Sequence, residues 1–250
     1  MLAGLYTAAT ALDAFQTSLS NSSNNLANVN TTAFKRNVVS FEDLTYTGPT
    51  YGQVGHGVNV AAISPRGFKE GAINNTGREL DVAISGNGLI PVQLPDGTIQ
   101  YTRDGGLQRD AAGHLATSKG YLVQPPITIP TDTTSITIGT DGTVSVITSS
   151  APKISKVLGQ IQLAHFVNQE GLLSQAGNLY SETAASGPPT LVIAGTNGTG
   201  QLLQRNLEQS NVDVSTELTA IVTAQSGYST NSRVVKSADQ MLSTALAIIQ

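Results

Sequence analysis

The chain has 250 residues, a net charge of −4 and no cysteine. Because no basic run accompanies this charge, the sequence argues against nucleic-acid binding, and the lack of cysteine excludes disulfides and thiolate metal sites. No apolar segment approaches the ~20 residues that cross a bilayer, and the N-terminus lacks the basic region and cleavage site of a secretory signal.

The composition favours thin β-structure and weakly charged surfaces. Only 12% of the residues are charged, about half the usual share, and 25 are glycine. Serine, threonine, asparagine and glutamine make up the polar surface instead. Such a surface suits dense protein–protein packing, where each buried charge needs a partner; a weakly charged soluble surface is the alternative.

The first predicted element is a helix over residues 1–29. Leucine recurs every seventh residue, and a second, mostly apolar file completes the heptad. The two files are Leu5, Leu12, Leu19 and Leu26, and Ala8, Phe15, Ser22 and Val29. The helix would be ~43 Å long and would end near residues 28–32, where asparagines cluster. Because a narrow seam of this kind packs against another helix, we expect a partner helix elsewhere in the chain.

Residues 34–57 are expected to be an extended or short helical connector. Phe34 and Phe41 flank a basic pair and two valines, and residues 47–57 are rich in glycine, proline and tyrosine. The latter composition is typical of a loop.

From Val58 to Val167 the hydrophobic period is near two, which predicts short strands. Asn-Gly and Asp-Gly pairs at residues 87–88, 96–97, 104–105 and 141–142 predict type I′ hairpin turns. The predicted strands are 58–63, 72–74, 80–84, 89–94, 99–103, 107–109, 121–123, 136–138, 143–147 and 158–166. We therefore expect one all-β domain over residues 58–170, followed by an extended connector over 171–211.

A second heptad helix is predicted from Val214 to the C-terminus. One apolar file recurs every seventh residue, and a parallel file lies four residues after it. The two files are Val214, Ile221, Tyr228, Val235, Leu242 and Ile249, and Leu218, Gln225, Ser232, Asp239 and Leu246. Asp213 or Ser215 is expected to cap the helix. The predicted fold is α+β: terminal helices (residues 1–33 and 212–250) paired as an antiparallel coiled coil, with the β domain inserted between them.

The sequence offers no convincing active site. His56, His114 and His165 are too dispersed for a metal site. The acid pairs at 42–43 and at 79 and 81 lack a defined cleft, and the glycine-rich run 195–200 lacks the ending of a phosphate loop. We therefore expect no catalytic residue, cofactor or metal.

The stretch Asn24–Lys35, with the sequence NNLANVNTTAFK, resembles the N-terminal signature of the flagellar rod and hook family of bacterial axial proteins. Further segments that are similar to the distal rod branch of that family follow in order along the chain. They are residues 41–44, 80–84, 94–98, 101–105, 136–139, 141–144, 159–163, 207–213 and 239–242.

Two segments depart from the distal rod pattern. Residues 46–53 are short where distal rod proteins usually carry an extra segment, and residues 225–229 read QSGYS where QRAYE is usual. Gly227 there costs ~1 kcal/mol of helix stability relative to alanine. Two alternatives within the family stay open: a hook protein without its outer domain, and a proximal rod protein.

The resemblance implies a non-enzymatic subunit of a helical, hollow tube that transmits torque from motor to hook and passes exported subunits. The implied partners are further copies of the chain, proximal rod proteins, hook or hook-junction proteins, the surrounding ring (bushing) proteins and the flagellar type III export apparatus. The implied location is the periplasm-spanning basal body, reached without a cleavable signal. The rival classes are an enzyme acting on peptidoglycan and a monomeric adhesin-like β domain.

We expect two sets of residues to serve assembly. The helical core would contain Leu5, Leu12, Phe15, Leu19, Leu26, Leu218, Ile221, Tyr228, Val235 and Leu242. Asn24, Asn25 and Asn28 would make contacts between subunits, because amides bond across neighbours without burying charge.

Overall fold

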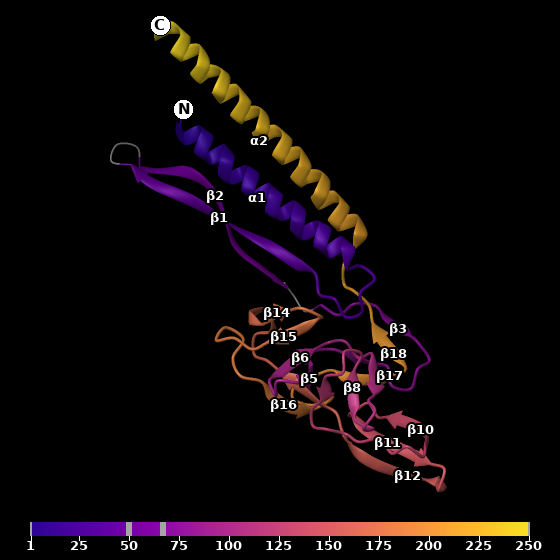
Figure 1. Ribbon diagram of the computed structural model, residues 1–250. Coiled ribbons are helices and arrows are strands. Elements are labelled where there is room, and N and C mark those ends of the chain that lie inside the picture. Colours follow the sequence, from indigo (N-terminus) through magenta and orange to yellow (C-terminus); the bar gives the residue numbers. More distant parts are fainter. Residues whose placement is uncertain (1, 49–51, 66–68, 250) are drawn as a thin grey trace. The chain divides into compact units, whose positions relative to one another are not determined.

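The computed structural model describes residues 2–48, 52–65 and 69–249 (Figure 1). The chain forms two compact units. Unit 1 contains Met1–Val29, Asn37–Ser64 and Val212–Gln250, and unit 2 contains Asn30–Arg36 and Pro65–Asn211. Helices occur in unit 1 and short strands dominate unit 2, which confirms the predicted α+β class.

Unit 1 is built on two long helices, α1 (Leu2–Ala27) and α2 (Val214–Ile249). They lie side by side and run in opposite directions (Figure 1). Asp213 begins α2 as predicted, because its carboxylate accepts hydrogen bonds from the Ser215 amide (3.1 Å) and the Thr216 hydroxyl (2.6 Å).

A two-stranded hairpin completes unit 1, where the sequence predicted a connector and a loop over residues 34–57 and a strand over residues 58–63, which lies within the second strand of the hairpin. Its strands are β1 (Asn37–Gly48) and β2 (Gly52–Pro65), and β1 packs against α1. Part of the predicted loop, residues 49–51, lies outside the described residues. Gly57 has a φ of +109° and lies against the side chain of Thr10, whose hydroxyl accepts the Val58 amide at 3.4 Å. Glycine and a polar side chain make this contact, although apolar residues alternate in β2 from Val58 onward.

Unit 2 contains one seven-stranded sheet in the order β14-β15-β6-β5-β9-β8-β7 and one three-stranded sheet, β10-β11-β12. Three two-stranded pairs, β13-β16, β17-β4 and β18-β3, accompany them, and the pairings are antiparallel. The strands are β3 (Ile73–Asn75), β4 (Val82–Ser85), β5 (Ile90–Gln93), β6 (Ile99–Thr102), β7 (Leu107–Arg109), β8 (Leu115–Thr117), β9 (Leu122–Val123), β10 (Thr133–Ile138), β11 (Thr143–Thr148), β12 (Ala151–Gln160), β13 (Gln162–His165), β14 (Leu173–Gln175), β15 (Leu179–Ser181), β16 (Thr190–Ile193), β17 (Gln201–Gln204) and β18 (Asn206–Glu208).

The predicted turns are only partly hairpins. Asp96-Gly97 joins β5 to β6 and Asp141-Gly142 joins β10 to β11, but the other two pairs connect strands that do not pair with each other. In both hairpins only the glycine has positive φ, +87°, so the turns are not type I′. Each aspartate instead accepts the amide two residues on, at 2.9 Å for Thr98 and 3.0 Å for Thr143.

Residues 171–211 form strands rather than an extended connector. Of these, β17 pairs with β4 and β18 pairs with β3. The pairing therefore joins segments more than one hundred positions apart, which a local pattern of three or four residues does not reveal. The core of unit 2 contains Val82, Ile84, Ile90, Val92, Leu107, Leu115, Ile129, Val144, Ile161, Leu163 and Leu202.

Candidate functional site

The contact between α1 and α2 is made mostly by small and half-buried side chains. On α1, Ala8, Ala14 and Ser22 are buried, and Leu5, Leu12, Phe15, Leu19 and Leu26 are half-buried. On α2, Ala224 and Ala238 are buried, and Ile221, Val235 and Leu242 are half-buried. Small residues allow the two helix backbones to approach closely, which leaves the larger side chains at the edges of the contact.

The second heptad file of α2 differs by one position from the predicted file. Leu218 of the predicted file is 48% exposed, whereas Glu217 is fully buried. Tyr228, predicted for the helical core from the first file, is 45% exposed. The buried file therefore passes through Glu217, Ala224 and Ala238 instead of Leu218, Gln225 and Asp239. Hydrophobicity alone selects the leucine, but the heptad spacing places the neighbouring glutamate at the helix contact.

The buried Glu217 meets an asparagine of α1. Asn25, also fully buried, donates to Glu217 Oε1 at 3.3 Å and to the Asn37 carbonyl at 2.9 Å, and its Oδ1 accepts the Asn37 amide at 3.0 Å. One side chain thus joins α1, α2 and β1. The structure gives Asn25 an intramolecular role, while Asn24 is exposed and accepts a hydrogen bond from the Asn28 side chain.

Two sides of α2 carry features that the described residues of unit 1 leave open. On one side Val214, Leu218 and Val222 are exposed and lie within about 80° of one another around the helix. On the other side a groove of about 620 Å³ runs between α2 and the rings of Phe15 and Phe41. A second groove, of about 470 Å³, continues on that side towards Met241.

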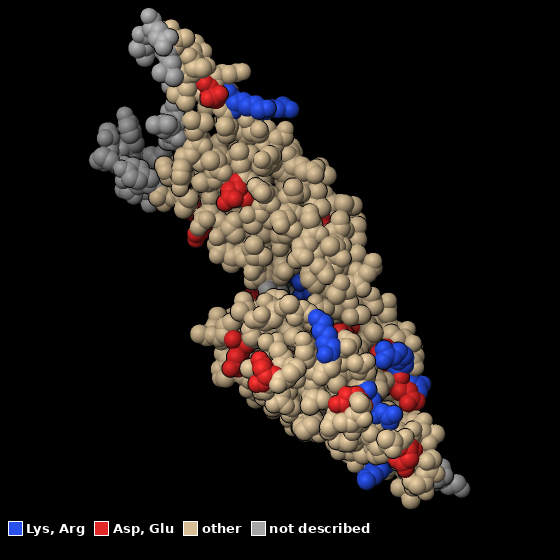
Figure 2. Space-filling model, in the orientation of Figure 1, with Lys and Arg blue, Asp and Glu red and all other residues tan. Residues whose placement is uncertain are grey.

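Charge is sparse on these helices. Asp13 is the one charged residue of α1 by sequence, and residues 218–232 of α2 contain none. Figure 2 shows few charged side chains over the helices and many more over unit 2. The surface that residues 218–232 of α2 form can therefore be buried without desolvating a charge of α2.

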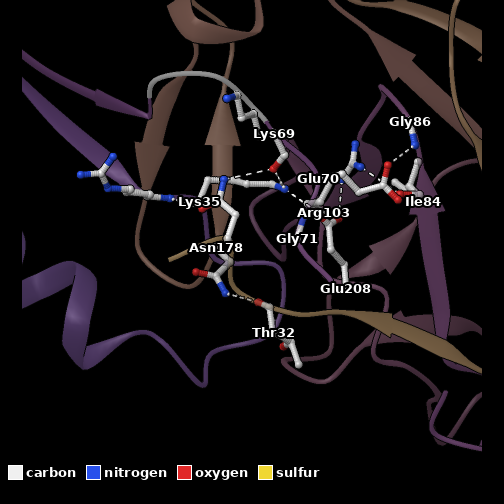
Figure 3. A network of polar contacts seen from close by, with 12 residues as sticks. Thr32, Lys35, Lys69, Glu70, Gly71, Ile84, Gly86, Arg103, Asn178 and Glu208 are labelled. Carbon is white, nitrogen blue, oxygen red and sulfur yellow. Dashed lines mark hydrogen bonds and ion pairs between the residues drawn. The ribbon is translucent and has the colours of Figure 1, made fainter. Parts of the chain in front are cut away.

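Unit 2 contains a buried ion cluster, formed by Lys35, Arg103 and Glu208 (Figure 3). The Glu208 carboxylate accepts from Lys35 Nζ at 2.5 Å, from Arg103 Nε at 2.6 Å and from the Gly71 amide at 2.8 Å. Arg103 also donates to two carbonyl oxygens, those of Ile84 (2.9 Å) and Gly88 (2.8 Å). The three side chains are therefore hydrogen-bonded as well as paired, which buried charges require.

Burial and charge act in opposite directions on the carboxyl of the ion cluster. Burial opposes ionisation of Glu208, but the charges of Arg103 and Lys35 and their hydrogen bonds outweigh it, so its pKa is lowered. Burial lowers the pKa of the Lys35 ammonium, and the neighbouring Glu208 offsets part of that effect. Burial, with Glu208 nearby, raises the pKa of the Tyr180 hydroxyl.

Sequence reasoning missed the ion cluster, because charged residues are read as surface. The three residues lie before β1, after β6 and at the end of β18, so they are far apart in sequence. A signal was nevertheless present. Each residue lies inside a motif that carries the family resemblance, namely residues 24–35, 101–105 and 207–213.

The acid pairs have structural partners. Glu42 accepts from the Asn59 side chain at 3.0 Å, Glu79 accepts the Ile136 amide at 3.1 Å, and Asp81 pairs with Arg78 at 3.2 Å. Among the described residues, no group of three or more histidines or acids is placed to hold a metal ion. No helix in the described ranges is long and apolar enough to span a membrane.

Comparison with known proteins places this architecture in a family of axial structural proteins. Residues 5–35 match the family "Flagella basal body rod protein". Residues 83–146 match "Flagellar hook protein FlgE/F/G D1 domain", and residues 203–248 match "Flagellar basal body rod FlgEFG protein C-terminal". The matches cover both helices and the middle of unit 2.

Relatives named "Flagellar basal-body rod protein FlgG" align over nearly the whole chain. The protein of Caulobacter vibrioides is 44% identical over 95% of this chain and 96% of its own length. Those of Borreliella burgdorferi and Bacillus subtilis are 41% and 37% identical, over 98% and 97% of both chains. The "Flagellar hook protein FlgE" of Salmonella typhimurium is 44% identical, but over 46% of this chain and 28% of its own.

The chain therefore belongs to the flagellar basal-body rod and hook protein family. Its similarity to FlgG relatives extends over nearly its full length, whereas its similarity to the hook protein is partial. It is a structural protein of the flagellar basal body and not an enzyme.

Proposed function

We propose that the chain is a subunit of the distal rod, which polymerises helically into a hollow tube. The tube transmits torque from the motor to the hook and lets exported subunits pass. The full-length similarity to rod proteins supports the rod over the hook. The alignment with the Caulobacter protein has 253 positions and includes 95% of this chain, or about 238 residues. About 15 positions of that relative therefore have no counterpart here. This difference agrees with a missing segment, which the sequence locates at residues 46–53.

Within one subunit, α1 and α2 form a two-stranded antiparallel coiled coil. The small residues of the contact and the half-buried Leu12, Leu19, Ile221 and Val235 support this pairing. The terminal helices would line the inside of the tube, and unit 2 would face outwards. Because an amphipathic helix without its partners is marginal in water, α1 and α2 fold on incorporation into the tube.

The observation that carries the proposal is the pair of unlike faces on α2. The row of Val214, Leu218 and Val222 lies on one side, and the groove beside Phe15 and Phe41 lies on the other, at the same level of the helix. A projecting row that fits a groove on the next copy makes a heterologous contact, which generates an open helical polymer rather than a closed dimer. The exposed Asn24, which carries a hydrogen bond from Asn28, would make further contacts between copies together with Asn28.

The neighbours of this subunit in the assembled axis would be proximal rod proteins on one side and hook or hook-junction proteins on the other. The surrounding ring proteins would contact the outer surface. The chain would reach the rod through the flagellar type III export apparatus, which passes unfolded chains.

A charge placed in the exposed row tests the proposal. We expect Val222→Asp to prevent tube formation by the purified chain while unit 2 keeps its fold. Leu191→Asp is the matched control, because Leu191 is a similarly exposed apolar residue on β16. If Val222→Asp assembles as well as the native chain, or if only Leu191→Asp blocks assembly, the helices are not the polymerising surface.

A further inference from the structure

Two members of the buried ion cluster, Lys35 and Glu208, lie close in sequence to points where the chain passes between the two units. The chain crosses at 29/30, 36/37, 64/65 and 211/212. Residues 30–36 contain Lys35, and residues 208–211 begin with Glu208. Residues 69–71 supply the Lys69 carbonyl, which accepts from Lys35 at 2.9 Å, and the Gly71 amide, which donates to Glu208.

Backbone and amide contacts reinforce the cluster within unit 2. The Ala33 amide donates to the Glu208 carbonyl at 2.9 Å, and the Asn211 amide donates to the Phe34 carbonyl at 3.3 Å. The Asn211 side chain accepts the Arg36 amide at 2.8 Å and donates to the Lys69 carbonyl at 3.0 Å. These bonds join three short segments that are otherwise separate in sequence.

The remaining member of the cluster fixes it to the β-structure. Arg103 follows β6 and donates to Ile84 in β4 and to Gly88 before β5. The carboxylate of Glu208 lies between Arg103 and Lys35, so it connects the interior of unit 2 to the segment that precedes β1. Separating one of these side chains from the others would leave a buried charge without its partner, which is strongly unfavourable. The segments that carry the three side chains are therefore expected to stay together.

We propose that the Lys35–Glu208–Arg103 cluster fixes the crossing segments 30–36, 69–71 and 208–211 to unit 2, independently of whether α1 and α2 are paired. The boundary between the part that is folded before assembly and the part that folds on incorporation then lies at the cluster. This second statement rests on the proposed function, but the anchoring of the three segments does not. Lys35 and Asn211 act as positioning residues, and Arg103 is the fixed point.

Residue-resolved hydrogen exchange on the full-length, unassembled chain tests the anchoring. The reporter amides are those of Ala33, Gly71 and Asn211 in the crossing segments, with Val92 in β5 as the core reference. In the native chain we expect the reporters to be protected even while the amides of α1 and α2 exchange freely. Should the helices prove protected in the monomer, folding on incorporation is wrong, but the anchoring stands.

Lys35→Met separates anchoring from general stability. The methionine keeps similar bulk without charge, and Glu208 keeps its partner Arg103, so the variant is expected to fold. Its reporter amides should exchange at least tenfold faster, with Val92 unchanged. Arg205→Gln is the matched control, because it removes a charge next to β18 from an exposed pair with Glu79, and it should leave the reporters unchanged.

A milder variant, Asn211→Ala, tests the anchoring even if Lys35→Met does not fold. Asn211→Ala removes only neutral hydrogen bonds and should speed exchange at Arg36 and Ala33 without altering Val92. The proposal is overturned if the native reporters exchange as fast as the helices in the monomer. It is equally overturned if Lys35→Met and Asn211→Ala leave the reporters unchanged, or speed the reporters and Val92 to the same extent.

Discussion

The ring of Phe15 lies directly on the backbone of Gly227. A side-chain carbon built at position 227 would lie 2.6 Å from Cε1 of that ring, and closer still to Cζ. Glycine destabilises a helix interior by ~1 kcal/mol relative to alanine. Here the absence of a side chain allows an aromatic ring of α1 to pack on α2, so a local cost permits the contact between the helices.

Gly227→Ala should therefore weaken the helix pair in spite of its better helix propensity. We expect the clash with Phe15 to cost about 1–3 kcal/mol, more than the propensity gain. The temperature at which assembled tubes dissociate should fall. Ser226→Ala, at the exposed neighbouring position, is the control and should leave that temperature unchanged or slightly raised. A Gly227→Ala tube that is more stable than the native one would contradict the packing.

Asn25→Ala should damage the subunit, whereas Asn24→Ala should not. The first change removes three hydrogen bonds, two to the backbone of the partly buried Asn37 and one to the buried Glu217 carboxylate, at a cost of about 1–3 kcal/mol. The second removes an exposed side chain. Thermal dissociation of tubes measures the first effect. If Asn24→Ala blocks lateral assembly while Asn25→Ala is neutral, the intramolecular role of Asn25 is wrong.

The ion cluster should make unit 2 sensitive to acid. Because the pKa of Glu208 is lowered in the folded state, its ionisation stabilises the fold above the ordinary glutamate value of 4.5, and this contribution is lost as the pH falls below that value. The melting temperature of unit 2, followed by near-UV circular dichroism, should drop between pH 5 and pH 3, a window of about two units around that value.

Glu208→Gln should flatten this acid response while lowering the melting temperature at neutral pH. Part of the slope should survive, because hydrogen bonds from Thr98 lower the pKa of Asp96 and those from Thr143 lower the pKa of Asp141. An acid response of equal steepness in Glu208→Gln and in the native chain would show that the cluster is not its source.

Two N-terminal deletions whose end points are only seven residues apart should differ in the melting temperature of unit 2. Removal of residues 2–29 leaves Lys35 and its segment in unit 2, so a folded monomer that cannot polymerise is expected. Removal of residues 2–36 takes away Lys35 and the Arg36 amide that donates to Asn211, so the melting temperature of unit 2 should be lower. The ordering is refuted if both deletions melt at the same temperature, and the helix mechanism is refuted if either forms tubes.

The sequence was sufficient to predict the two helices and most strands from Val82 to Ile147, because periodic apolar residues mark them. Of the hairpin, residues 58–63 of β2 were predicted, but β1 and the start of β2 were not, and part of their contact with α1 is made by Thr10 and Gly57 rather than by periodic apolar residues. The second file of α2 was shifted by one residue, since a buried glutamate at 217 is chemically unexpected beside Leu218. The hydropathy of a residue describes its own side chain, and it does not show whether a hydrogen-bond partner is present that allows a polar side chain to be buried.

The ion cluster shows the same limit at longer range. Lys35 and Glu208 are 173 positions apart and Arg103 lies 105 positions from Glu208, so no local pattern joins them. Their burial follows from three crossing segments that meet only in the folded chain. Sequence motifs marked the neighbourhoods of all three residues, but the reason for those motifs is a contact in space.

Electron cryomicroscopy of tubes assembled from the purified full-length chain would show which surfaces join the copies. We expect a hollow helical tube whose inner wall is formed by α1 and α2, with Val214, Leu218 and Val222 of one copy in the groove beside Phe15 and Phe41 of the next. A tube held together by unit 2 alone, with these residues of α2 facing solvent, would contradict it.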